Sequence, residues 1–164
     1  MRKTFAPVDD VLIERLFQPA SDLITQRIGL SRAKAACFCI DLASLSWIAS
    51  RVRGISGSVT EWNASGAFLD FALLLLGLVA LISLRTLFRR AVGKHGNPLR
   101  LAMQPHRAVV LMMLIARLVQ LQAPGLGEAA DLAMLVFAAS ALYLGACTER
   151  PPIRRGWAVL APAG

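Results

Sequence analysis

The sequence predicts an all-α membrane protein, a bundle of four transmembrane helices preceded by an amphipathic helical segment. The chain of 164 residues is 56% hydrophobic and only 17% charged, below the roughly 25% of charged residues in soluble domains. Residues 67–84 form an apolar run with a single charge, and arginines follow it at once. Lysine and arginine also gather in three separate regions of the chain. Together these observations predict several membrane crossings with an assigned direction.

Residues 1–34 are expected to form the amphipathic segment on the cytoplasmic side. Apolar residues from Val8 to Phe17 recur at helical spacing beside charged residues. Pro19 is expected to interrupt this helix, and Ser21 and Asp22 to cap a second short helix. Such a pair of helices would lie flat on the membrane surface. Docking on a soluble partner is the alternative.

Four apolar segments within residues 35–147 are candidate membrane spans, at 35–50, 67–84, 108–122 and 129–147. The second and the fourth are long enough to cross a hydrocarbon layer of about 30 Å. The first and the third are shorter, and each contains a charged residue. By length alone, these two also fit interfacial or re-entrant segments.

The positions of lysine and arginine favour four crossings. Basic residues concentrate before residue 35, between the second and third segments, and after residue 147, whereas the other two connections contain only Arg51 and Arg53. Positively charged connections stay in the cytoplasm, so an even number of spans must separate the three basic regions. Both termini, including the tail 148–164, are then cytoplasmic. The alternative is that only the second and fourth segments cross.

The cellular location is predicted from the same layout. About thirty residues precede the first apolar segment, too many for the n-region of a cleavable signal peptide. We therefore expect a multi-pass protein of the bacterial inner (cytoplasmic) membrane.

The connection between the second and third segments is a basic loop, for which we predict contact with anionic lipid headgroups. Its basic residues are Arg85, Arg89, Arg90, Lys94, Arg100 and Arg107. A nucleic-acid site would interleave aromatic residues for base stacking, and Phe88 is the only such residue here. Nucleic acid is therefore not expected as a partner.

Four charged residues lie inside the predicted spans, where each costs at least ~2.5–3.5 kcal/mol unless it has a partner or faces water. Asp70, Arg117 and Asp131 all fall in the outer third, so Arg117 is expected to pair with Asp131, with Asp70 or with both. Asp41 lies toward the cytoplasmic end and is expected to be isolated, with Lys34 reaching toward it. We interpret the outer cluster as structural, and the alternative is a proton or ion relay. For Asp41 the functional alternative is a carboxylate in a cytoplasmic half-channel.

Small residues share helix faces with these charges and are expected to point inward, where they let helices approach closely in lipid. They are Ala138, Ala141 and Gly145 beside Asp131, and Gly77 and Ala80 beside Asp70.

No catalytic constellation is recognisable, because the sequence lacks HExxH, GxSxG and P-loop patterns. We expect a non-enzymatic protein with no metal site and no cofactor. The first hypothesis is a scaffold or accessory subunit of a larger membrane assembly, in contact with a protein partner or with further copies of itself. The alternative is a permeation protein, namely an oligomeric channel, a transporter subunit or a holin-like protein, with Asp70, Arg117 and Asp131 around the path.

Overall fold

The computed structural model of the protein describes residues 2–91, 97–120 and 126–148. Within these ranges every regular element is a helix, which confirms the all-α prediction. Lys94 and most of the predicted tail lie outside the described residues.

Four helices form the body of the molecule: α3 Arg32–Thr60, α4 Ala64–Ala91, α6 Gln104–Gln120 and α7 Leu126–Ala146. Three stretches are long and apolar enough to cross a membrane, namely Arg32–Thr60, Ala64–Arg90 and Glu128–Ala146. The remaining helix, α6, has 17 residues and is therefore only about 25 Å long. A crossing by all four helices stays a prediction.

The first predicted span is longer than its apolar run. We expected it at 35–50, but α3 continues through Arg51 and Arg53 to Thr60. No proline interrupts residues 51–60, and α4 lies alongside α3, so the change in polarity does not end the helix. The chain turns at Trp62, whose φ is +56°, and Asn63 accepts a hydrogen bond from the Gly66 N–H at 3.0 Å to start α4.

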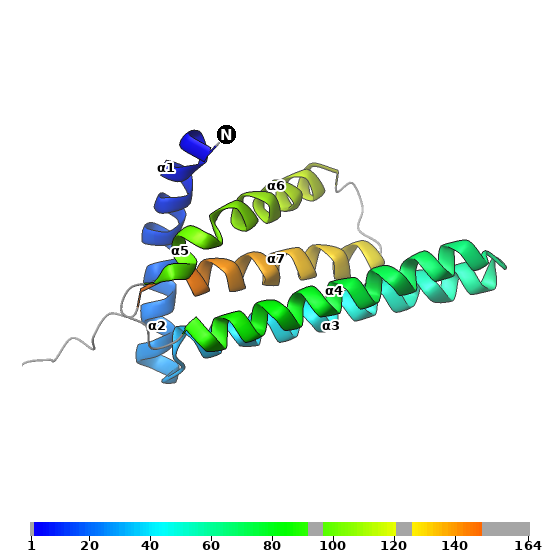
Figure 1. The fold of residues 1–164 in the computed structure, drawn as a ribbon, viewed down its shortest axis with the longest axis horizontal. Helices are drawn as coiled ribbons and strands as arrows, with labels where there is room; N and C mark the ends of the chain where they lie inside the picture. The colour runs from blue at the N-terminus through cyan, green and yellow to red at the C-terminus, as the bar shows by residue number, and fades with distance from the viewer. Residues whose placement is uncertain (1, 92–96, 121–125, 149–164) are drawn as a thin grey trace, which may run out of the picture.

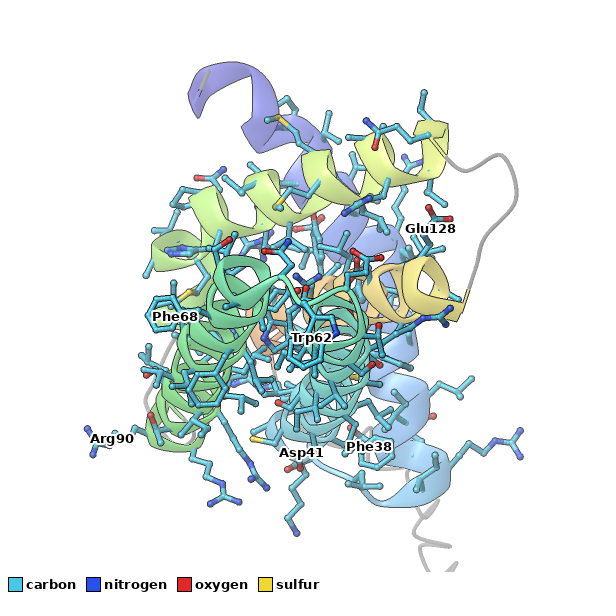
Figure 2. All side chains as sticks on the ribbon, turned by 90° about the vertical axis from the view of Figure 1, so that its right-hand side faces the viewer. Phe38, Asp41, Trp62, Phe68, Arg90 and Glu128 are labelled. Carbon is cyan, nitrogen blue, oxygen red and sulfur yellow. The ribbon has the colours of Figure 1, made fainter. Side chains whose placement is uncertain are left out.

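The helices are arranged in the order α4–α3–α7–α6. α3 packs along both α4 and α7, and α7 also packs along α6 (Figure 1). The hairpin of α3 and α4 extends beyond α7 at one end of the molecule. Trp62 lies at the tip of this hairpin and is almost fully exposed (Figure 2).

The N-terminal segment crosses the opposite end. α1 Arg2–Leu12, the π-helical turn η1 Ile13–Phe17 and α2 Gln18–Ile28 follow one another as a column across the ends of the long helices (Figure 1). The predicted break at Pro19 and cap at Ser21 and Asp22 are wrong. Pro19 stands in the first turn of α2, where its missing N–H costs little, and the preceding turn widens to a π-helix.

Small residues fill the interface between α3 and α7. Ala36 and Ala43 of α3, and Ala138 and Ala141 of α7, are at most 8% exposed. Backbones can approach closely at such positions, which strengthens packing between apolar helices. Ala138 and Ala141 thus face inward as expected, whereas Ala80 of α4 is exposed, contrary to the expectation.

A buried ion pair attaches the N-terminal column. Asp9 of α1 accepts hydrogen bonds from Arg107 of α6, with 2.9 Å to Nε and 2.6 Å to Nη2, and both side chains are buried. Arg100, in the short helix α5 Pro98–Ala102, pairs with Asp10 and Glu14 at 2.9 and 3.0 Å. The hydrogen bonds to these two carboxylates raise the pKa of Arg100. The predicted lipid contact is wrong for Arg107, because the fold buries its guanidinium against Asp9.

The column and the chain before α5 also cap the end of α7. Asn97 donates hydrogen bonds to the carbonyls of Gly145 and Cys147, both at 2.8 Å. Gln18 donates to the carbonyl of Thr148 at 2.9 Å and accepts from its N–H at 3.1 Å. The Asn97 hydrogen bonds satisfy carbonyls at the end of α7 that have no intrahelical partner, and the Gln18 hydrogen bonds hold the residue that follows.

Removal of the Asp9 carboxylate should destabilise the protein far more than removal of the Asp10 carboxylate. Asp9→Ala leaves the Arg107 guanidinium buried without its counter-charge, which costs about 3–5 kcal/mol. Asp10→Ala breaks a pair in which the Asp10 side chain is 56% exposed, and this costs at most about 1 kcal/mol. Equilibrium unfolding by SDS in mild detergent, followed by circular dichroism, measures both values. Equal losses would show that the buried pair contributes no more than a surface pair.

Gly77 of α4 is expected to control how closely α3 and α4 pack. A Cβ at Gly77 would overlap the indole of Trp47 on α3, whereas a Cβ at Gly57 would meet nothing within 4 Å. Gly77→Ala should therefore cost about 1–3 kcal/mol through overpacking. Gly57→Ala should be neutral or stabilising by up to about 1 kcal/mol, since alanine favours the helix. Thermal unfolding in detergent micelles compares the two variants, and a stable Gly77→Ala protein would contradict the close contact.

Candidate functional site

Arg51 of α3 is the centre of a cluster of charges near the hairpin end of the bundle. Its Nη1 lies 3.1 Å from Oδ1 of Asp70 on α4, and its Nη2 lies 3.3 Å from Oδ1 of Asp131 on α7. The three side chains are 18–22% exposed. One guanidinium therefore connects three helices.

Asp131 has two further partners. The hydroxyl of Ser50 donates a hydrogen bond to its Oδ1, and Nη2 of Arg117 on α6 lies 3.8 Å from its Oδ2. The Arg117 side chain is 51% exposed. Of the two partners expected for Arg117, the structure places Asp131 beside it, and Asp70 instead pairs with Arg51.

The cluster is electrically balanced within the described residues. Arg51 and Arg117 carry two positive charges, and Asp70 and Asp131 carry two negative charges. Arg51 also lies over the ring of Trp47, with 4.7 Å from Cζ to the ring centroid. Stacking and bidentate pairing both suit the planar guanidinium of arginine, so this geometry fixes the side chain between its two carboxylates.

Gly54 gives Asp70 the room to enter the cluster. A Cβ at Gly54 would lie 2.7 Å from the nearer carboxylate oxygen of Asp70. Trp47, Ser50, Arg51 and Gly54 recur at spacings of three and four residues, so all four project from one side of α3. Neither Ser50 nor Arg51 was predicted from the sequence, because Ser50 is the last residue of the apolar run and Arg51 follows it. The recurrence of Trp47 and Arg51 at a spacing of four was the available signal.

A second ion pair lies nearer the basic end of the molecule, the end at which the last turn of α4 carries Arg89 and Arg90. Nη2 of Arg85 on α4 lies 3.0 Å from Oδ2 of Asp41 on α3, and both side chains are about two-fifths exposed. Asp41 was expected to be isolated, and this is wrong because α4 brings Arg85 alongside it. Lys34, which was expected to reach toward Asp41, lines the same cavity as Asp41. Arg85 was likewise expected in the lipid-facing loop. In Figure 2, Asp41 and Phe38 lie on the side of α3 that faces away from α6.

The two sets of charges connect neighbouring helices at different levels of the bundle. Asp41 and Arg51 are ten residues apart on α3, about 15 Å along the helix axis. Among the described residues, no three His, Cys, Asp or Glu side chains gather in a way that would hold a metal ion. The paired charges therefore fix α3 against α4 at two levels and against α7 at one.

Comparison with protein-family models, with curated proteins and with solved structures found no significant match.

The two arginines of the cluster should contribute very differently to stability. Arg51→Gln leaves Asp70 without a cation and should cost about 3 kcal/mol, the lower end for a broken buried pair, because water reaches part of the site. Arg117→Gln leaves Asp131 with Arg51 and Ser50, so it should cost less than about 1 kcal/mol. Denaturation in detergent, followed by tryptophan fluorescence, measures the difference.

Arg53→Gln is the matched control for this comparison, because it removes the same charge from the same helix. Arg53 has no ion pair among the residues that the structure describes. If Arg117→Gln proved the more damaging change, Arg51 would not be the centre of the cluster.

Proposed function

We propose that the chain is a non-enzymatic, multi-pass protein of the bacterial inner membrane that acts as a scaffold or accessory subunit of a larger membrane assembly. Both termini lie in the cytoplasm in this proposal, and α3, α4, α6 and α7 cross the membrane.

The apolar surface of α4 supports the membrane setting. None of the most apolar window of α4 is buried, and the mean hydropathy of this window is 2.5. The exposed large apolar side chains of this helix include Phe68, Phe71, Leu75, Leu76, Val79 and Ile82. Soluble monomers rarely expose a continuous apolar surface of this kind. Lipid is therefore the favourable surrounding for α4.

The N-terminal column supports the orientation. It crosses the end of the molecule at which α4 carries Arg85, Arg89 and Arg90 (Figure 1). Val11, Leu16 and Leu23 of the column are exposed. An amphipathic segment perpendicular to the spans can place such residues in the headgroup layer, and the neighbouring arginines favour the cytoplasmic leaflet.

One observation carries the proposal of a scaffold: the open row of helices leaves an apolar groove between α4 and α6. The groove has a volume of about 490 Å³, and residues of α4, α6 and α7 line it, among them Leu84, Leu87, Val109, Val110 and Leu142. The four charged residues within the predicted spans meanwhile all have ion-pair partners in the protein itself. The surface left for other molecules is therefore apolar and fits a helix of another membrane protein.

The alternative is permeation, and the exposure of Arg117 favours it. A side chain that is 51% exposed with its ion-pair partner at 3.8 Å can exchange that partner for water or an ion. An oligomer that placed several copies of α6 around an axis would bring these arginines to the path.

Photo-crosslinking should find a protein in the groove. A photoreactive residue at Leu87 or Val109, which line the groove, is expected to give one crosslinked product of defined mass in intact membranes. The control positions, Ile82 of α4 and Ile115 of α6, are similarly exposed but lie outside the groove. They should give lipid adducts. Crosslinking to protein that is equal at all four positions would contradict a groove-specific partner.

Reconstitution into liposomes distinguishes the scaffold from a channel. Purified protein in liposomes should show no ion flux in the scaffold proposal. If flux were present and Asp131→Asn abolished it while the protein still assembled, permeation would replace the scaffold.

A further inference from the structure

A second cavity lies between α3 and α4 near the basic end of their hairpin. Its volume is about 530 Å³, and it is open to the surroundings. Lys34, Phe38 and Asp41 of α3 form one wall, and Arg85 and Arg89 of α4 form the other. Phe38 and Asp41 lie on the side of α3 away from α6 (Figure 2), so this cavity is separate from the apolar groove.

The cavity carries an excess of positive charge. Lys34, Arg85 and Arg89 contribute three positive charges, and Asp41 contributes one negative charge. Asp41 pairs with Arg85 at 3.0 Å and holds its guanidinium at the wall. The Nε of Arg85 is buried without a hydrogen-bond partner. One carboxylate cannot balance three cations, so the cavity favours an anion.

The start of α3 adds hydrogen-bond donors beside these cations. Leu30, Ser31 and Ala33 also line the cavity. Ser31 is the N-cap residue of α3, but its side chain makes no capping hydrogen bond. The first N–H groups of this long helix therefore lie next to the cavity at the positive end of the helix dipole, where an anion is favoured.

An apolar stripe leads away from the cavity along α3. Phe38, Leu45, Val52 and Val59 follow one another at intervals of seven residues, and each is more than half exposed. A seven-residue interval keeps side chains on nearly one face of a helix. The first and third members are fourteen residues apart, about 21 Å along the axis. A small inorganic anion would gain nothing from contact with this apolar stripe, whereas a hydrocarbon chain could lie along it and be shielded from water.

We propose that this cavity binds the phosphate headgroup of an anionic phospholipid, with an acyl chain lying along the stripe. The site rests on the membrane setting proposed above and adds to it a defined lipid position. The phosphate contacts Lys34, Arg89 and the start of α3, while Arg85 keeps its pair with Asp41. A bound lipid would thus bridge α3 and α4 where their basic ends meet.

Lipid binding by the purified full-length protein in mild detergent tests the site. Native mass spectrometry would measure the affinity for phosphatidylglycerol, with phosphatidylcholine as the neutral comparison. Lys34→Gln/Arg89→Gln should weaken the binding of phosphatidylglycerol about tenfold or more, since each basic residue contributes ~1 kcal/mol. Phe38→Ala should weaken it as well while leaving all charges in place.

Arg27→Gln/Arg90→Gln is the matched control. Both arginines are exposed, both lie at the basic end of the molecule, and neither lines the cavity. This variant should bind phosphatidylglycerol within twofold of the unaltered protein. An equal loss in the two double variants would show unspecific attraction and would overturn the site.

Two displacement experiments identify the class of ligand. Inorganic phosphate at millimolar concentration should not displace phosphatidylglycerol, and displacement would assign the cavity to a soluble phosphate. Displacement by an acidic peptide with unchanged binding by Phe38→Ala would assign it to a protein segment. Either result overturns the lipid proposal.

A carbonate wash of membranes distinguishes a failure of the lipid site from a failure of the proposed membrane setting. Protein released by the wash would refute the membrane setting itself. Protein that is retained, but whose lipid affinity is unchanged in Lys34→Gln/Arg89→Gln, would refute only the lipid site.

Discussion

The arrangement of the long helices depends on how Arg51 is neutralised. Its guanidinium lies among predominantly apolar helices, where an unpaired charge is costly. Its two terminal nitrogens both meet a carboxylate only when Asp70 and Asp131 approach it together. This requirement sets the rotation of α4 and α7 about their axes and the level at which each meets α3. Gly54 and Trp47 complete the site by leaving space for one carboxylate and covering the guanidinium. The small residues between α3 and α7 then let the two helices pack closely.

A different set of contacts holds the basic end of the molecule together. Asp9 and Arg107 form a buried pair that attaches the N-terminal column to α6, and Gln18 and Asn97 cap the end of α7. With one end closed by the column and the other held by Arg51, the outer faces of α4 and α6 have no role in holding the fold together. These faces are therefore available for contact with the surroundings of the molecule.

The long helices could be located from the sequence because their apolar runs are strong and continuous, as on α4, but α3 extends ten residues beyond its predicted end at residue 50. Sequence reasoning was less successful with charges. Arg107 was expected at the lipid headgroups and Asp41 was expected to be isolated, yet each has an ion-pair partner on another helix. A basic residue after an apolar run indicates the side of the membrane equally well whether it faces lipid or a carboxylate. Arg51 was overlooked for a related reason, since the end of an apolar run is not the end of a helix.

The sequence by itself determined the all-α class, the positions of the strongest apolar runs and the end of the molecule where positive charge collects. These properties depend on composition and on the spacing of residues along the chain, which are local. Only the tertiary structure decided which acid meets which base, because that choice depends on helix rotation, axial offset and the reach of an arginine side chain. Asp70 is 19 residues from Arg51 and Asp131 is 80, and no pattern along the chain relates the three.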